Sequence, residues 1–569
     1  MLAKTRYSLV ILLVFLAAAC GSDSASEADA GTADAGLGPD AMPGVDLSEA
    51  LFRPDHVLEV TITMAPEDFA LLRAEPETVG APKITCGSQP QTRPYNYYPG
   101  EITVDGETVG NVGIRKKGSL GSLSTLRPGL KIKANEYISG QRIFGLKRLT
   151  LNNNHQDDSR ISQCLGYSLF RAAGVPAPRC SFAHVVVNGE DMGIYSNVES
   201  LKKNFLRRHF ADDSGNLYES GGEFRPGETA GFQPKVNKTA PDCSDLTGVV
   251  DALQASDANF RSELDTVVDV DAFATFWAME VLLSHWDGYT NNRNNYFFYH
   301  DPSSDKFHFI PWGADSLFTT RTRSTRPQSV YACGSLPWRL YNLPDTRELY
   351  LGRLRELLDS VWDEPAILLQ ITAMRELIEP FADPQNTGEL AEKIAGVSDY
   401  VTTRRAALLA EINLTAPAWT LPDGVDSCFI TLGTIDGTFS TVWDSLDNFG
   451  AGTGTTSGTI ANIPVDSTTG FSSAGIDAEG KAIVRLFTEL PDGTFAVIFV
   501  LVQDPADLTV GTIALDITTA LAIMTFYDPV TDVSSGGGLM IGGTMTLTSA
   551  GQNPGDAIVG TVTSSVLEL

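Results

Sequence analysis

The alternation of hydrophobic and polar residues predicts a strand-rich first part of the chain. VLEVTITM (57–64) and GEITVDGETVGNVGIRKKG (100–118) have the period of two that is typical of strands, and KIKANEY and KRLTLNN continue it. SFAHVVVNGEDMGIYSNVES predicts a hairpin that turns at Asn188 and Gly189, a residue pair that favours the tight turns of hairpins.

Helical spacing dominates the following part. SRISQCLGYSLFRAAGV predicts a helix with Ser159 as its N-cap and Gly174 as its stop. A second helix is expected from about Asp271 to Trp286, and more helices over residues 347–412. Strands followed by helices indicate an α+β fold with a strand-rich lobe and a helical lobe.

The pattern changes again near residue 415. From Pro417 onward Lys481 and Arg485 are the only basic residues, and β-branched segments such as KAIVRLF, TFAVIFVLVQD and GTMTLTS are bounded by turn residues. We expect an all-β, sandwich-like domain over residues 416–569. Its aspartates lie mainly in turns, where they cap backbone groups, and calcium binding is the alternative interpretation.

Size and charge limit the possible functions. A chain of 569 residues is too long for one ordinary hydrophobic core, so two or more domains are expected. The formal net charge is −29, whereas binding along a phosphate backbone needs clustered Lys and Arg. Nucleic acid is therefore not an expected partner.

The first residues have the features of an export signal. Lys4 and Arg6 precede an apolar run over residues 9–16 and three alanines, after which comes Cys20. This order resembles a bacterial lipoprotein signal over residues 1–20, with Cys20 as the lipidated residue. A plain cleaved signal is the alternative. Residues 21–47 have few large apolar side chains before residue 43, so we expect a disordered tether. The resulting prediction is a protein anchored by lipid in the bacterial cell envelope, at the outer membrane or cell surface.

Six further cysteines permit disulfides in an exported chain: Cys86, Cys164, Cys180, Cys243, Cys333 and Cys428. Six cysteines allow fifteen complete pairings, and the sequence does not choose among them. The chain has no C-x-x-C spacing and no H-E-x-x-H motif, which argues against a zinc site.

HWDGYTNNRNNYFFYHDPSSDKFHFIPWGAD (285–315) is the segment with the clearest candidate chemistry. We expect Asp287 at the C-terminal end of the second helix, followed by a cluster of asparagines. YFFYH and KFHFIPW then predict a hairpin that returns Asp315 to the side of Asp287. Two carboxylates with an amide can form a site for Mg²⁺ and phosphate, and Asp287 and Asn292 have the D-x-x-x-x-N spacing of protein kinases. Alternatively, these residues cap turns and bind backbone amides.

Several motifs are similar to those of the spore coat protein H (CotH) family of atypical protein kinases. GIRKKGSLGS and LRPGLKIKAN resemble its loop and following strand, and KRLTLNNNHQDDSRISQCLGYSLFRAAGVPAPRCSFAHVVVNGEDMGIYSNVES resembles its central block. DGYTNNRNNYFFYH and FHFIPWGAD resemble the motifs that carry its catalytic residues. The resemblance covers about residues 55–415. It implies a two-lobed, protein-kinase-like domain over residues 48–415 that uses ATP with Mg²⁺ or another divalent cation to phosphorylate Ser or Thr of a protein.

The resemblance also implies roles for single residues. Asp287 would be the catalytic base or the carboxylate that orients the substrate, and Asn292 or Asn295 would hold the metal together with Asp315. The nucleotide-binding residues would be Gly118, Ser119 and Ser122 in the loop over the phosphates, Arg127 or Lys131 as the basic residue that pairs with phosphate, and Glu199 as the carboxylate that orients it.

Two residues depart from the family pattern. Gly313 stands where the family usually has an aspartate, and Lys117 replaces an arginine before Gly118. Export would also take the domain to a compartment where ATP is scarce. The alternative function is therefore a weakly active or inactive surface lipoprotein that acts in adhesion or in the structure of the envelope.

Overall fold

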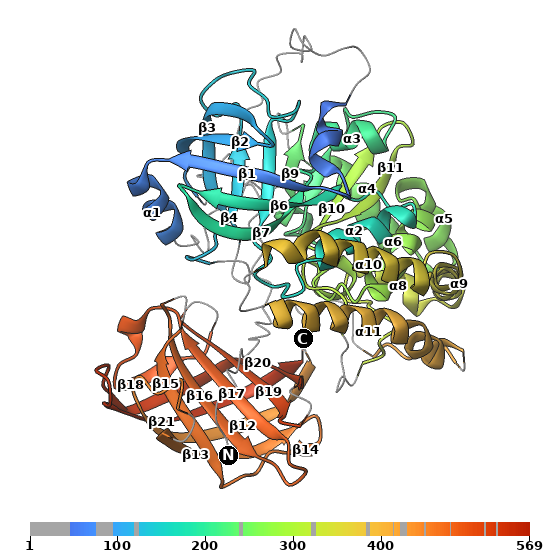
Figure 1. Cartoon of the computed structure of the whole chain (residues 1–569). Helices are drawn as coiled ribbons and strands as arrows, with labels where there is room; N and C mark the ends of the chain where they lie inside the picture. The colour runs from blue at the N-terminus through green and yellow to red at the C-terminus, as the bar shows by residue number, and fades with distance from the viewer. Residues whose placement is uncertain are drawn as a thin grey trace. The chain divides into compact units, whose positions relative to one another are not determined.

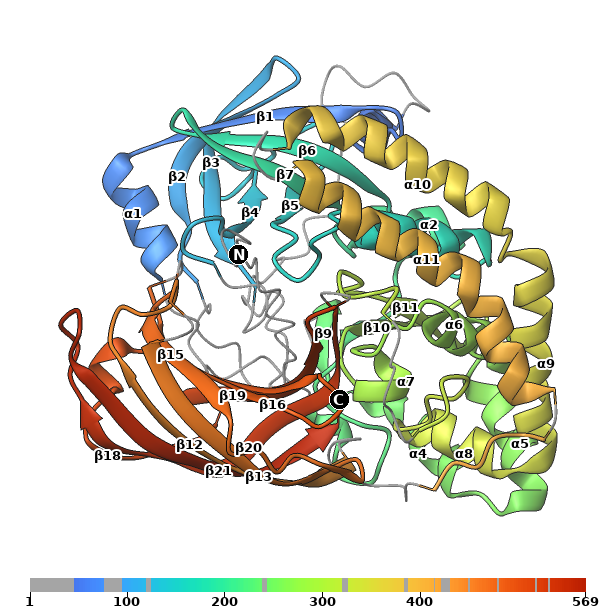
Figure 2. The same ribbon diagram turned by 60° about the horizontal axis from the view of Figure 1, so that its bottom comes forward.

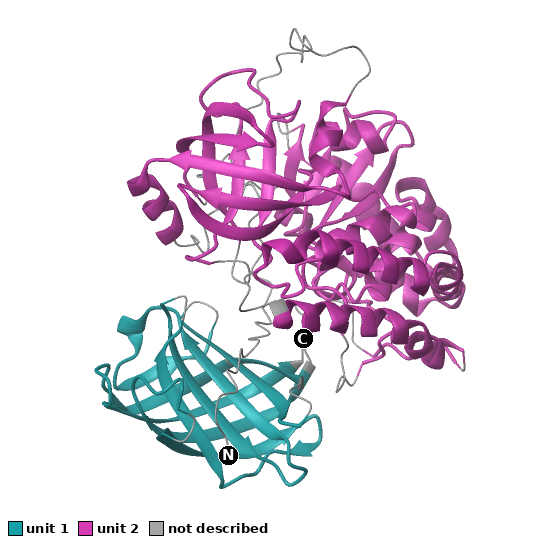
Figure 3. Cartoon of the chain, in the orientation of Figure 1, with its two compact units in different colours: residues 1–16, 321–325, 429–569 teal, residues 17–320, 326–428 magenta. Residues whose placement is uncertain are grey.

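The computed structural model describes residues 46–75, 95–118, 124–237, 243–319, 326–382, 387–413, 415–420, 430–448, 451–477, 480–516, 519–530 and 533–568. These residues divide into two compact units, one that ends before residue 421 and one that begins at residue 430 (Figure 3). Among the described helices, none has the length and apolar character needed to cross a lipid bilayer.

A closed barrel of seven strands forms the first part of the larger unit (Figure 1). In the order in which they pair, the strands are β1 (Val57–Met64), β2 (Tyr98–Val104), β3 (Glu107–Lys117), β4 (Gly129–Lys133), β5 (Arg148–Asn152), β7 (Glu190–Val198) and β6 (Cys180–Val187). The parallel pairing of β1 with β6 closes the barrel. Alternate residues such as Ile62, Ile114 and Ile132 fill its interior, which explains the period of two in the sequence. A 3-10 helix (Leu47–Phe52) precedes β1, and α1 (Pro66–Ala74) follows it.

A four-stranded sheet and a set of helices form the remainder of this unit. The sheet has the order β11 (Lys306–Pro311), β10 (Tyr296–Asp301), β8 (Leu217–Glu219) and β9 (Gln233–Val236). The helices are α2 (Ser162–Ala172), α3 (Lys203–His209), α4 (Thr247–Gln254), α5 (Asp257–Val267), α6 (Val270–Leu282), α7 (Tyr289–Asn292), α8 (Ser335–Asn342), α9 (Pro344–Ser360), α10 (Glu364–Ile378) and α11 (Thr387–Ile412). In Figure 2, α10 and α11 run side by side. Helix α6 is buried from Phe273 to Leu282, so the main core of the unit surrounds most of it.

Local signals in the sequence are confirmed where they depend on backbone conformation. The β6–β7 hairpin turns at Asn188 and Gly189, both of which have positive φ angles. Gly174 has φ +78° directly after α2 and ends that helix as predicted. The prediction of Ser159 as the N-cap is wrong, because α2 begins at Ser162 and the carboxylate of Asp157 accepts the hydrogen bond of the Ser162 N–H at 2.8 Å.

Disulfides are present in the described residues. Cys164 of α2 is bonded to Cys180 of β6, which ties the helix to the barrel wall. Cys243 and Cys333 are also disulfide-bonded. Cys86 and Cys428 lie outside the described residues.

The C-terminal unit is all-β, but its strands form one sheet whose two ends meet. The strands are β12 (Ile430–Val442), β13 (Gly452–Ile460), β14 (Ile463–Pro464), β15 (Gly470–Ile476), β16 (Ala482–Glu489), β17 (Phe495–Val502), β18 (Gly511–Ala514), β19 (Ala520–Asp528), β20 (Val533–Ala550) and β21 (Ala557–Glu568). β12 pairs with both β21 and β13, so the sheet closes on itself around its core. The predicted sandwich is therefore not confirmed. Pairing between strands far apart in the sequence decides between the two folds, and local patterns do not report it.

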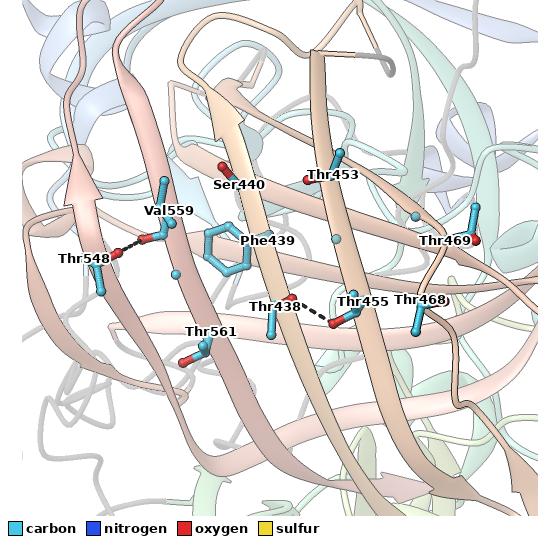
Figure 4. A pocket seen from close by; sticks show the side chains of 13 residues that line it. Thr438, Phe439, Ser440, Thr453, Thr455, Thr468, Thr469, Thr548, Val559 and Thr561 are labelled. Atoms are coloured by element: carbon cyan, nitrogen blue, oxygen red, sulfur yellow. Dashed lines mark hydrogen bonds between the residues drawn. The ribbon is translucent and has the colours of Figure 1, made fainter.

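A depression of about 590 Å³ lies on this unit and is lined mainly by threonine (Figure 4). Thr438 and Thr455, which are register partners on β12 and β13, join their hydroxyl groups at 2.7 Å. The lining residues are Thr, Ser, Gly, Phe and Val, none of which ionises near neutral pH. This depression therefore offers no acid, base or anionic metal ligand.

Candidate active site

The loop between α6 and α7 carries Asp287 in a conformation that the sequence did not predict. Helix α6 ends at Leu282 and not at Trp286, and Ser284 takes φ +56°, which is incompatible with a continuing helix. Asp287 is therefore not at the helix end, where the sequence predicted it. The loop is held by Glu280, a fully buried residue that accepts hydrogen bonds from the Tyr289 N–H at 3.0 Å and the Thr290 N–H at 2.8 Å.

Asparagine side chains surround the carboxylate of Asp287. Asn292 Nδ2 donates to Asp287 Oδ1 and Asn295 Nδ2 donates to Oδ2, each at 2.6 Å. Asn294 Nδ2 approaches both oxygens, at 3.2 and 3.3 Å. Asn291 instead donates to the carbonyl oxygen of Trp286 at 2.6 Å. The predicted cluster thus consists of three amides that hold the carboxylate and one that holds the backbone of the loop.

The protonation of Asp287 reflects its burial and a neighbouring charge. Burial raises the pKa of Asp287 to about 6, although hydrogen bonds from Asn292 and Asn294 oppose this change. The negative charge of Asp315 raises this pKa further. The charge of Asp315 therefore acts on Asp287, and a carboxylate whose pKa is near 6 is suited to proton transfer near neutral pH.

Asp315 lies after β11, at the junction between the four-stranded sheet and the barrel. The hairpin of β10 and β11 is formed as predicted, with Tyr296 opposite Pro311 at its open end. Asp315 is 8% exposed, and its Oδ2 accepts a hydrogen bond of 2.9 Å from Asn152 Nδ2 at the end of β5. The same amide of Asn152 donates to Gln163 Oε1 of α2 at 3.0 Å. The barrel thus contributes directly to the position of Asp315.

The side chain of Asn295 leaves no room for a Cβ atom at residue 313, which explains why this residue is a glycine. The backbone of Gly313 has φ +52°, and a Cβ atom added there would overlap the side-chain amide of Asn295. Asn295 Nδ2 also lies 3.5 Å from the carbonyl oxygen of Gly313. The departure from the family pattern at this position is therefore coupled to the amide that holds Asp287.

The residues predicted to bind phosphate lie on or near β3 and β4. Gly118 follows β3 with φ +122°, and its carbonyl oxygen accepts a hydrogen bond of 2.8 Å from the Tyr95 hydroxyl. Arg127 donates to the carbonyl oxygens of Met192 and Ile194 on β7, at 2.8 Å each. Lys131, in the middle of β4, is 5% exposed. Ser119, Ser122 and the predicted lipidation site Cys20 lie outside the described residues.

Glu199 contacts two arginines. It accepts hydrogen bonds of 3.1 Å from the Arg179 N–H and 3.0 Å from Arg179 Nη2, and Arg208 forms an ion pair with both of its oxygens. Burial raises the pKa of Glu199, but the hydrogen bonds and charges of Arg208 and Arg179 outweigh it and hold this pKa below its usual value. Neither arginine is the basic residue that Glu199 was predicted to orient, and its role at the nucleotide site stays a prediction.

Sequence reasoning missed Asp157 and Asn152 as neighbours of Asp315. Burial raises the pKa of Asp157 to about 6, and the charge of Asp315 adds to this effect. Hydrogen bonds from Ser159 and Ser162 oppose it. The run LNNNHQDDS, which begins in the last two residues of β5, resembles the asparagine run after Asp287, and this density of polar residues at a strand end is the signal in the sequence.

The donor atoms at this site fit a hard divalent cation. Mg²⁺ binds oxygen ligands and is typically held by one or two carboxylates together with substrate phosphates. Asp287 and Asp315 supply carboxylate oxygens, and Asn292 and Asn295 supply amide groups beside them. Within the described residues, no group of three or more His, Cys, Asp or Glu forms a site that would hold a metal without such phosphates.

The order of the parts is that of a kinase-like protein: an aspartate, asparagines within the next residues, a hairpin, and then a second aspartate. The family model described as CotH kinase protein matches residues 114–408, which is just over half of the chain. The chain therefore belongs to the CotH family.

Among similar proteins is the inner spore coat protein H of Bacillus subtilis, which is 25% identical over 264 residues, or 43% of this chain and 72% of that protein. The invasin CotH3 of Rhizopus delemar is 23% identical over 203 residues, or 32% of this chain and 34% of the invasin. The chain thus spans about a third of the invasin. The crystal structure of the proinflammatory kinase CtkA of Helicobacter pylori is similar with a TM-score of 0.21 and 10% identity, covering 57% of this chain and 95% of that one. A likeness at this TM-score supports no conclusion.

Proposed function

We propose that this protein is a kinase of the CotH family that transfers the γ-phosphoryl group of ATP, with Mg²⁺, to a serine or threonine hydroxyl of a protein. The observation that carries the proposal is the partly buried Asp287, whose carboxylate is held by amides and is influenced by the charge of Asp315. Positioning and charge neutralisation are most of what phosphoryl transfer requires, so such a site suits this chemistry.

In the proposed reaction Asp287 accepts the proton of the acceptor hydroxyl. The hydroxyl oxygen forms a bond to the γ-phosphorus as the bond between this phosphorus and the β–γ bridging oxygen breaks, and ADP leaves. Asn292 and Asn295 fix the direction of the Asp287 carboxylate, so that its free lone pairs face the acceptor. Asp315 and the oxygen of Asn292 or Asn295 would hold the divalent cation, which supplies charge neutralisation of the phosphates when it is bound.

The test is phosphate incorporation from γ-labelled ATP into a Ser- and Thr-rich protein by the purified full-length chain. Asp315→Ala should abolish incorporation. Asp305→Ala is the matched control, because Asp305 lies on the same hairpin with a side chain that is 88% exposed, and this variant should retain the activity. Incorporation that is unchanged in Asp315→Ala would exclude the assignment.

The alternative is a non-catalytic surface protein that keeps the same fold. The three amides that donate to Asp287 would also serve to hold an inert loop. Calorimetric titration with ATP and Mg²⁺ distinguishes the two functions, because an adhesion or envelope protein should show no metal-dependent nucleotide binding.

We also propose that the protein is exported and anchored by lipid at Cys20. The disulfide between Cys164 and Cys180 supports export, because disulfides persist in oxidising compartments. Labelled palmitate should be incorporated into the wild type and not into Cys20→Ser. Equal labelling of both proteins would exclude Cys20 as the anchor.

A further inference from the structure

Two basic residues lie side by side on the outer face of the barrel. Arg115 of β3 is the register partner of Lys131 of β4. Their neighbours Ile114, Leu130 and Ile132 belong to the barrel core, so alternation along the strands directs Arg115 and Lys131 away from that core. Both basic residues are nevertheless buried, at 3% and 5% exposure. Other parts of the protein therefore cover this face.

A third basic residue, Lys235, approaches Arg115 from the four-stranded sheet. Burial lowers the pKa of Lys235, and the positive charge of Arg115 lowers it further, whereas Glu219 opposes both effects. The positive charge of Arg115 on β3 of the barrel therefore acts on Lys235 on β9 of the sheet. We call Arg115, Lys131 and Lys235 the basic cluster.

Lys235 is held in place by its own sheet. Its ammonium group forms an ion pair with Glu219, and both side chains are 2% exposed. Lys235 Nζ also donates to Gln233 Oε1 at 3.1 Å, and Gln233 Nε2 donates to the carbonyl oxygen of Ser220 at 3.0 Å. Two neighbouring strands therefore fix the direction of a buried lysine, an arrangement that limits its rotamers before any ligand binds.

The basic cluster lies next to the two aspartates. Glu219 is the register partner of Phe297, which follows Asn295 by two residues, and two residues of extended chain span about 7 Å. On the barrel, Lys131 is the register partner of Thr150, and Asn152 on the same strand binds Asp315. On the sheet, the basic cluster is therefore linked by one strand pair to the segment that holds Asp287. On the barrel, it is linked by one strand pair to the residue that binds Asp315.

We propose that Lys235 contacts the phosphates of the nucleotide from the four-stranded sheet, opposite Arg115 and Lys131 of the barrel, and that Glu219 is its positioning residue. The combined positive charge of the basic cluster attracts anions, and a polyphosphate next to Asp287 and Asp315 would add its negative charge to that of Glu219, which already pairs with Lys235. The inference rests on the proposed kinase function, and it adds a basic residue that the sequence motifs did not indicate.

Nucleotides that differ in their phosphates provide the test. Binding of ATP with Mg²⁺, ADP and adenosine is measured by calorimetry with the full-length chain and with Lys235→Met, Lys235→Arg and Glu219→Gln. Loss of a charge-assisted hydrogen bond predicts that Lys235→Met binds ATP about 10- to 100-fold more weakly. Adenosine binding should not change, and Lys235→Arg should keep most of the affinity for ATP. Glu219→Gln should lie between the wild type and Lys235→Met.

Lys306→Met is the matched control, since Lys306 lies at the start of β11 on the same sheet and is only partly buried. If Lys235→Met fails to fold, chemical labelling of the wild type tests the same inference. An acyl-phosphate derivative of ATP acylates lysines that adjoin the nucleotide phosphates, and peptide mass spectrometry should find the label on Lys235.

The outcomes separate this inference from the proposed function. If the wild type binds ATP and Lys235→Met binds it equally well, or if the acyl group appears on Lys131 alone, the inference is wrong and the proposed function stands. An equal loss of adenosine and ATP binding would also overturn it, because a structural role would affect both ligands. If the wild type binds no nucleotide, both the inference and the proposed function fail.

Discussion

Asn152 Nδ2 donates a hydrogen bond of 2.9 Å to Asp315 Oδ2, and this contact joins the barrel to the segment that follows β11. Asn152 is buried at the end of β5, and Asp315 is nearly buried after the hairpin. Any movement of the barrel relative to the four-stranded sheet must therefore break this hydrogen bond or move Asp315.

Replacing Asn152 should weaken catalysis more than stability. A hydrogen bond to a charged group contributes about 1.5–3 kcal/mol, so Asn152→Ala should lower kcat/KM for ATP about 10- to 100-fold. Steady-state phosphorylation measures this effect. Asn342→Ala is the control, because its amide makes only an exposed contact with the carbonyl oxygen of Trp338. Equal activities of the two variants would remove Asn152 from the site.

The raised pKa of Asp287 links activity and stability to pH. Its ordinary value is 3.8 and its value in the folded protein is about 6, so the folded protein binds more protons than the unfolded chain between these pH values. The free energy of unfolding should therefore decrease as pH rises through this window, and Asp287→Asn should be more stable than the wild type at pH 7. The same variant should lose phosphorylation activity.

Denaturant unfolding at pH 4 and pH 7 measures this dependence. Asp157 has a pKa of about 6 for the same main reason, burial, so Asp287→Asn should remove only part of the pH dependence. In the wild type, kcat/KM should fall as pH decreases below about 6, because the base becomes protonated. A variant that is less stable than the wild type at pH 7 would contradict this account.

Gly313→Ala should destabilise the protein through both backbone strain and overlap. A non-glycine residue in this left-handed conformation costs about 1–3 kcal/mol, and its Cβ would displace the amide of Asn295. Unfolding of the single variants and of Gly313→Ala/Asn295→Ala tests the coupling. The double variant should be more stable than additivity predicts, by about 0.5–3 kcal/mol. Additive effects would show that the two residues do not compete for space.

Replacing Glu199 should reduce stability without changing nucleotide affinity. Glu199→Ala removes the buried carboxylate that Arg179 and Arg208 share, although Arg179 keeps its pairs with Asp46 and Glu49, so the loss should be about 1.5–3 kcal/mol. Because the pKa of Glu199 is lowered, the stability it adds is present above its ordinary value of 4.5 and is lost as pH falls. Thermal unfolding and the KM for ATP give the two readouts. A raised KM for ATP in folded Glu199→Gln would support the role that the family resemblance implies, in which Glu199 orients the basic residue that pairs with phosphate.

The disulfide between Cys164 and Cys180 should stabilise the barrel. The cysteines are 16 residues apart, and a loop of about this length predicts roughly 3 kcal/mol. Cys164→Ser/Cys180→Ser should lower the free energy of unfolding by this amount under oxidising conditions. The wild type in reductant should approach the double variant. No difference between oxidised wild type and the double variant would refute the contribution.

Features that depend on neighbouring residues could be predicted from the sequence. The turn at Asn188 and the end of a helix at Gly174 follow from backbone preferences. The approach of Asp315 to Asp287 follows from a short hairpin. The roles of these aspartates in catalysis remain predictions.

Features that depend on distant contacts could not be predicted. Helix α6 ends before Trp286 because Glu280 binds the amides of a loop that lies about two turns further along the chain. Lys235 and Glu219 become a buried pair only when β8 and β9 join the hairpin of β10 and β11. A single charged residue in a short strand has no sequence pattern that predicts a buried ion pair.

The pairing of β12 with both β13 and β21 has a consequence for contacts between copies of this unit. A sheet with open sides can recruit strands from neighbouring copies, which is a common route to fibres. Among the described strands of this unit, each long strand pairs with a neighbour on both sides, so its backbone groups are hydrogen-bonded. The short β14 and β18 lie outside this closed order of strands. This unit therefore offers few open strand edges through which a second copy of the chain could pair.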